Sequence, residues 1–197
     1  MRVLLLHAFP LDPSMWESQR PVLESHDVTA PSIYGRGNTM DAWAASLLDE
    51  LDGPFDLVVG ASMGGGCALA LERLSPGFAG ALVLAGAHAG PDAPERRPAR
   101  EQQIAELREQ GDAEKVAVVE ALRDRPDDRA TLRALAGPVL VVVGGSDATI
   151  PVDVARNLAE SARDGRLVVL EGAGHLVSLE QPEAFNRALA ELVRELS

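Results

Sequence analysis

The stretch that decides the fold runs from Gly60 to Gly64 and has the sequence Gly-Ala-Ser-Met-Gly. It follows an apolar run over residues 55–59 that is typical of a strand, and it precedes residues 63–74, whose composition favours a helix. A G-x-S-x-G motif between a strand and a helix is typical of a nucleophile elbow, a sharp turn that lifts the serine hydroxyl clear of the sheet. The alternative is chance, because the chain is rich in glycine. We take Ser62 as the candidate nucleophile.

Two further candidate catalytic residues follow later strands, in the chain order that a serine nucleophile of this kind requires. Asp147 comes shortly after the apolar run 139–143, and His175 shortly after the run 167–170. Parallel strands end at one edge of a sheet, so these two side chains are expected to meet Ser62 there. The histidine would take the serine proton, and the aspartate would orient the imidazole and stabilise its charged form. Taken singly, Asp147 is equally a turn residue or helix N-cap, and His175 a loop histidine.

Four blocks of the sequence resemble the α/β-hydrolase-fold family, in particular its esterases, enol-lactonases and cofactor-free perhydrolases. The resemblance covers nearly the whole chain. The blocks are residues 3–10, similar to a strand followed by H-G-x-P; residues 34–38, similar to a D-x-R-G-x-G loop; the motif at 60–64; and the Asp147 and His175 segments together. The resemblance implies that the backbone N–H groups of Phe9 and Met63 form the oxyanion hole, where two fixed donors stabilise the developing negative charge.

The sequence departs from the family pattern at two positions. Ala8 stands where the family usually has glycine, which is harmless if its φ stays negative and strained otherwise. Tyr34 stands where the loop usually has aspartate, so a carboxylate that could brace the loop is absent. Some members take the catalytic acid from the preceding strand, where Asp92 lies here. We favour Asp147, because Pro91 and Pro94 make the Asp92 segment resemble a hinge.

The pattern of apolar runs predicts a single α/β domain over residues 1–197. Strands are expected at about residues 2–7, 27–30, 55–60, 80–85, 138–143 and 166–170, and helices at about 40–51, 63–74, 152–162 and 182–195. Strands that alternate with helices indicate a doubly wound, mostly parallel sheet of about six strands. The resembled fold has eight strands, so the first two are expected to be missing.

Residues 88–137 interrupt this alternation. Helices are expected at about 95–110, 112–125 and 128–135. Insertions at this point form a lid over the site in the resembled family, and apolar positions on these helices could cover a pocket. The alternative is an ordinary crossover connection. We expect a short helical lid.

Composition and the remaining motifs exclude several classes of function. The formal net charge of −12 argues against nucleic acid or an anionic membrane as partner. The glycines fit neither a dinucleotide-binding nor a phosphate-binding loop, and no two histidines have metal-ligand spacing, so we predict no cofactor and no metal. The one cysteine, Cys67, is expected to be buried, His7 to be structural, and His26 to lie on the surface. Residues 1–6 are too short an apolar stretch for a signal sequence, which makes the cytoplasm the expected location.

The sequence leaves three classes of function. The first is a serine hydrolase of small carboxylic esters, thioesters or lactones, acting through an acyl-enzyme on Ser62. The second is a non-hydrolytic enzyme with the same triad, such as a perhydrolase (haloperoxidase-like) or a lyase. The third is a binding protein that has lost the chemistry, which the intact triad disfavours. Dehalogenases and epoxide hydrolases of this fold use an aspartate nucleophile, so Ser62 argues against both. The short lid favours small acyl groups, and the oligomeric state stays open.

Overall fold

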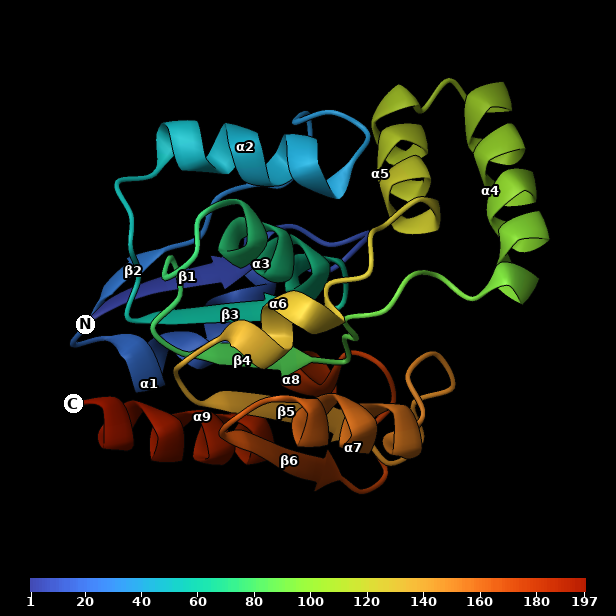
Figure 1. Cartoon of the computed structure of the whole chain (residues 1–197). Helices are drawn as coiled ribbons and strands as arrows, with labels where there is room; N and C mark the ends of the chain where they lie inside the picture. The colour runs from blue at the N-terminus through green and yellow to red at the C-terminus, as the bar shows by residue number, and fades with distance from the viewer.

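A computed structural model describes all residues, 1–197, and contains one six-stranded sheet (Figure 1). The strand order is β2-β1-β3-β4-β5-β6, and every neighbouring pair is parallel. The strands are β1 (Arg2–Leu6), β2 (Asp27–Thr29), β3 (Leu57–Ala61), β4 (Leu82–Ala85), β5 (Val139–Gly144) and β6 (Gly165–Leu170). The predicted strands and the parallel α/β sheet are confirmed.

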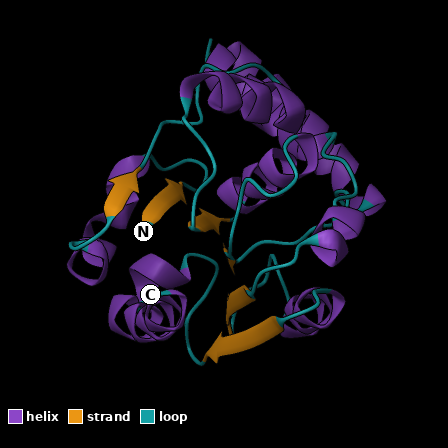
Figure 2. Cartoon of the chain, turned by 60° about the vertical axis from the view of Figure 1, so that its left-hand side comes forward, coloured by secondary structure: helices purple, strands orange, loops and turns teal.

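Helices cover both faces of the sheet (Figure 2). They are η1 (Pro13–Gln19), α1 (Arg20–Leu23), α2 (Met40–Glu50), α3 (Met63–Leu74), η2 (Pro94–Arg96), α4 (Arg97–Glu109), α5 (Ala113–Arg123), α6 (Arg129–Ala134), α7 (Val152–Ser161), α8 (Val177–Glu180) and α9 (Pro182–Leu196). The predicted helices are present. The short elements η1, α1 and α8 were not predicted, because segments of this length show no apolar period. None of these helices combines the length and the hydropathy needed to cross a bilayer.

Two apolar layers hold the sheet between the helices. Alternate residues of β1 belong to different layers: Leu4 and Leu6 pack with α2, α3 and α7, whereas Val3 and Leu5 pack with α1 and α9. The continuous apolar runs in the sequence reflect this burial on both faces. Cys67 is fully buried in the first layer, as predicted, and burial raises the pKa of its thiol to about 12.

The segment predicted as a lid divides into two parts. Helices α4 and α5 lie side by side beyond the carboxyl ends of the strands and share a small apolar cluster of their own (Figure 1). The chain turns between them at Gly111, whose φ is +72°, and Asp112 caps α5 by accepting a hydrogen bond from the N–H of Lys115. Helix α6 instead packs against α3 and α7. Only the α4–α5 pair therefore occupies the position expected of a lid.

Candidate active site

Ser62 occupies a sharp turn between β3 and α3. Its φ is 48° and its ψ is −108°, and it is the only non-glycine residue with positive φ. The glycines on either side are required by close approach: a Cβ at Gly60 would lie 2.5 Å from the carbonyl oxygen of Gly64, and one at Gly64 would lie 2.1 Å from that of Leu6. The local geometry is that of a nucleophile elbow.

The three predicted triad residues form one hydrogen-bonded chain. The Oγ of Ser62 lies 2.9 Å from Nε2 of His175, and Nδ1 of His175 lies 2.8 Å from Oδ2 of Asp147. Because the buried carboxylate can only accept, the proton of the neutral imidazole is assigned to Nδ1. Nε2 is then free to accept the hydroxyl proton of Ser62.

Backbone contacts fix the two supporting residues. The side chain of Asp147 is fully buried, and its Oδ1 accepts hydrogen bonds from the N–H groups of Thr149 and Ile150 at 2.7 Å and 3.0 Å. The loop of His175 passes so close to Gly86 that a Cβ there would lie 2.6 Å from the His175 carbonyl oxygen. Both side chains are thus held at the carboxyl edge of the sheet by the loops after β4, β5 and β6.

Asp92, the alternative acid, lies elsewhere. Its carboxylate binds Nε of Arg100 at 3.0 Å and Nη2 of Arg125 at 2.7 Å. Burial raises the pKa of Asp92, but these two guanidinium groups outweigh that effect and hold the pKa below its ordinary value. Of the two candidate acids, the structure places Asp147 in contact with His175.

The two predicted oxyanion-hole donors flank Ser62 from different elements. Met63 is the first residue of α3, where the backbone N–H has no acceptor within the helix. Phe9 follows β1, lines the same cavity as Ser62 and His175, and donates no hydrogen bond from its N–H within the protein. Ala8, beside Phe9, is not among the residues with positive φ, so its Cβ is tolerated.

His7 and Tyr34 support the segment that carries Phe9. His7 is fully buried, accepts a hydrogen bond from the N–H of Ile33 at Nε2, and contacts the carbonyl of Ala8 through Nδ1. Burial lowers its pKa, and the structural role predicted for it is confirmed. The hydroxyl of Tyr34 donates to the carbonyl oxygen of Leu11 at 2.8 Å. The tyrosine therefore braces this segment where the family pattern has a carboxylate.

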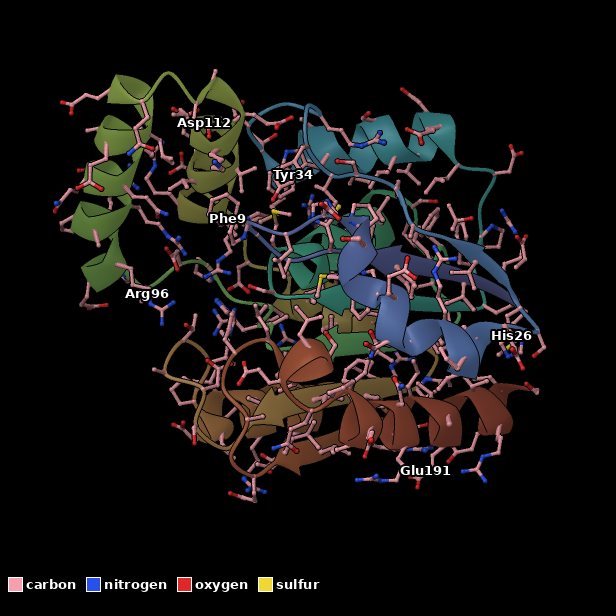
Figure 3. All side chains as sticks on the ribbon, turned by 180° about the vertical axis from the view of Figure 1, so that it is seen from behind. Phe9, His26, Tyr34, Arg96, Asp112 and Glu191 are labelled. Atoms are coloured by element: carbon pink, nitrogen blue, oxygen red, sulfur yellow. The ribbon has the colours of Figure 1, made fainter.

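A cavity of about 140 Å³ lies beside Ser62 and His175. Its wall includes Arg96, Arg100 and Arg125, which the sequence analysis did not single out. Figure 3 shows Arg96 at the base of α4, on the side of the loop after β5, and Phe9 below α5. The spacing of Arg96 and Arg100 in a predicted helix places them on one face. That spacing was the available signal, whereas the position of Arg125 depends on how two helices fold back on each other.

His88 also lines this cavity and is uncharged at neutral pH. Its Nδ1 accepts a hydrogen bond from the N–H of Gly90 at 3.2 Å, so the ring proton is on Nε2. Burial, and then the charge of Arg125, lowers its pKa to about 4. No cluster of three or more His, Cys, Asp or Glu side chains in residues 1–197 could hold a metal ion.

Comparison with known proteins identifies the family of this chain. The sequence pattern of the Alpha/beta hydrolase family matches residues 3–188. A pimeloyl-[acyl-carrier protein] methyl ester esterase of Aromatoleum aromaticum is 30% identical over 98% of both chains. A 3-oxoadipate enol-lactonase of Acinetobacter baylyi is 37% identical over 45% of this chain and 33% of its own. A thermophilic esterase from Thermogutta terrifontis superposes with a TM-score of 0.89 at 30% identity, covering 100% of this chain and 90% of that one. The protein is a hydrolase, and the chain belongs to the Alpha/beta hydrolase family.

Proposed function

We propose that the protein is a serine hydrolase that cleaves small carboxylic esters, thioesters or lactones through an acyl-enzyme on Ser62. The observation that carries the proposal is the continuous chain of hydrogen bonds from Ser62 through His175 to Asp147 at the carboxyl edge of the sheet. The esterases among its relatives support a carboxylic ester as the substrate.

In the first half of the reaction, Oγ of Ser62 attacks the substrate carbonyl carbon while its proton passes to Nε2 of His175. The carbonyl oxygen becomes an oxyanion, which the N–H groups of Phe9 and Met63 stabilise. When this intermediate collapses, the bond to the leaving oxygen or sulfur breaks, and His175 returns the proton to the leaving group. The acyl group stays on Ser62.

In the second half, water replaces the leaving group as the partner of His175. The imidazole takes a proton from the water as its oxygen attacks the acyl carbon, and Ser62 departs with the proton returned. The products are a carboxylic acid and the free enzyme. The carboxylate of Asp147 takes up no proton in either half of the reaction and stabilises the imidazolium in both. With hydrogen peroxide in place of water, the same step would give a peracid.

The size of the cavity supports a small acyl group. At about 140 Å³ it is smaller than the roughly 300–1,000 Å³ typical of pockets for drug-sized ligands. The acyl chain would gain binding energy only over the carbons that this cavity covers, since burial of a methylene contributes about 0.8 kcal/mol where protein surface is present.

The test combines covalent labelling with a substrate panel. A fluorophosphonate probe is expected to label the protein once, and Ser62→Ala to abolish labelling and lower ester turnover by about 10⁴-fold or more. The panel contains p-nitrophenyl esters, thioesters and lactones, with peroxide-dependent halogenation as a separate arm. Full activity in Ser62→Ala would refute the mechanism, and halogenation well above ester turnover would favour perhydrolysis.

A further inference from the structure

The wall of the cavity beside Ser62 carries three guanidinium groups. Arg96 ends η2, Arg100 lies one turn further along in α4, and Arg125 follows α5. The net charge of the whole chain is −12, so this local cluster has the opposite sign to the rest of the molecule. Such a cluster raises the local concentration of anions and favours their binding.

One carboxylate holds two of the three cations in place. Asp92, whose side chain is only 4% exposed, bridges Arg100 and Arg125. Arg125 itself is 13% exposed, and a guanidinium keeps its charge even when burial lowers its pKa. The bridge fixes both side chains, so little conformational entropy is lost when an anion binds.

The positive charge of the cluster is only partly compensated. Asp92 balances one of the three arginines, and the carboxylate of Asp147 is already bound to His175 and to two backbone N–H groups. Arg96 donates to the carbonyl oxygen of Thr149 at 2.7 Å, which carries no charge. His88 is neutral, as described above. Other nearby acids, Asp124 and Glu101, pair with arginines outside the cavity.

Arg125 also retains an unused donor. Its Nε–H is buried and has no hydrogen-bond partner in the protein. Since this nitrogen has almost no exposed surface, a ligand in the cavity would meet the terminal nitrogens of the Arg125 guanidinium instead. A planar carboxylate is the group that matches a guanidinium in shape, charge and hydrogen bonding.

We propose that this cavity binds a carboxylate carried by the substrate, and that the preferred substrates are therefore esters or lactones of short acids with a second carboxylate. The inference rests on the proposed function and adds to it the substrate class. Ser62 supplies the chemistry, and Arg96, Arg100 and Arg125 select the anionic acyl group. Both the serine and the three arginines line this one small cavity, so a short substrate can reach them together.

The first experiment compares two substrates of nearly equal shape. Monomethyl glutarate carries a terminal carboxylate, and methyl glutaramate has the neutral amide in its place. We expect kcat/KM to be at least about tenfold higher for the carboxylate, because hydrogen bonds between charged groups are about twice as strong as neutral ones. Equal values on an active enzyme would overturn the inference and leave the proposed function standing. Absence of turnover with any ester, with no fluorophosphonate labelling, would instead refute the proposed function.

The second experiment assigns the preference to the cluster. In Arg125→Gln and Arg96→Gln, the ratio of kcat/KM for the two substrates is expected to fall toward one, with partial recovery in Arg125→Lys. The ratio is measured on one preparation, so partial loss of folded protein cancels. Arg97→Gln removes an equal charge from an exposed position on α4 and is the matched control. An unchanged ratio in both cavity variants would overturn the assignment.

A binding measurement gives a readout independent of turnover. Ser62→Ala is expected to bind glutarate in calorimetry, and the Ser62→Ala/Arg125→Gln double variant to bind it at least about tenfold more weakly. Glutaramide, the uncharged diamide, serves as the neutral control ligand. Equal binding of the two ligands to Ser62→Ala would contradict a carboxylate site.

Discussion

The sheet with its flanking helices and the α4–α5 pair differ in how many of their residues are buried. In α3, nine of the twelve residues are buried, whereas in the thirteen-residue α4 only Ile104 is. The apolar cluster inside the pair contains three buried residues, against 33 and 22 on the two faces of the sheet. The core of the molecule rests on apolar burial. Helix α5 joins that core through Val118, Ala121 and Leu122, whereas α4 contributes no residue to either layer.

Polar contacts also attach the pair to the rest of the molecule. Arg96 donates to the carbonyl oxygen of Thr149, Arg100 and Arg125 bind Asp92, and Asn38 donates to Glu120 of α5 at 2.9 Å. Such contacts at a partly exposed site are weaker than a core and are screened by salt. The candidate catalytic residues therefore lie on the well-buried part of the molecule, whereas Arg96 and Arg100 of the cavity wall lie at the start of α4, which the core does not hold.

The largest expected effect separates the two acids, one from each region. Asp147→Asn is expected to lower ester turnover by about 10⁴-fold, because the amide no longer stabilises the imidazolium and favours the wrong tautomer. Asp92→Asn makes the same change of charge just before the α4–α5 pair. This variant is expected to lose far less ester turnover, since Asp92 does not contact His175. Steady-state kinetics on a neutral ester measure both. If Asp92→Asn were the crippled variant, the acid would be wrongly assigned.

A second prediction tests whether the two regions open independently. Leu69 is fully buried in α3, and Leu69→Ala is expected to lower the free energy of unfolding by roughly 2–5 kcal/mol. Amide exchange is expected to accelerate in α3 and to stay unchanged in α4, because α4 contributes no residue to the core layers and can open without them. Ile104→Ala is the matched change within the pair and is expected to accelerate exchange there. Equal acceleration of both regions in Leu69→Ala would show that they unfold as one unit.

The third prediction concerns acid stability at the junction of the two regions. The pKa of His88 is about 4 in the folded protein and about 6.5 in the unfolded chain, so the unfolded state binds the proton more tightly. The contribution of neutral His88 to the free energy of unfolding is therefore complete above pH 6.5 and is lost as the pH falls from there toward 4. His88→Gln cannot take up this proton, and its Tm is expected to fall less over the same range. If the Tm of the unchanged protein and that of His88→Gln fell equally with pH, the lowered pKa of His88 would be contradicted.

The smallest expected effect depends on how much of a substrate's acyl chain the α4–α5 pair covers. For a series of neutral esters, kcat/KM is expected to rise by about fourfold per methylene while the chain is covered, and to level off at about two to six carbons. The fourfold factor corresponds to about 0.8 kcal/mol per methylene. A rise that continues through a ten-carbon ester would mean that the α4–α5 pair covers more of the substrate than the cavity indicates.

Local sequence patterns predicted most of the fold, because the central strands β3, β4 and β5 are continuous apolar runs and the long helices show an apolar period. The elbow at Ser62 was also predictable, since the G-x-S-x-G motif and its neighbouring elements lie within one short segment. Asp147 and His175 could be placed because parallel strands end at the same edge. These inferences all use residues whose position follows from the element that carries them.

The arginine cluster could not be predicted in the same way. Arg96 and Arg125 come together only because α5 folds back beside α4, and no periodicity in the sequence fixes how two such helices pack. The same holds for the hydrogen bond from Tyr34 to Leu11, which joins two loops. Tertiary packing determines these contacts, and sequence patterns describe only the separate elements.

The backbone conformation of Ser62 lowers the stability of the protein at the position that its proposed activity requires. A non-glycine residue at φ 48° and ψ −108° costs of order 1–3 kcal/mol, which the surrounding core has to offset. Replacement by glycine would relieve that cost and remove the nucleophile in the same step. The best-packed part of the molecule thus contains one position at which selection for stability alone would eliminate the enzyme.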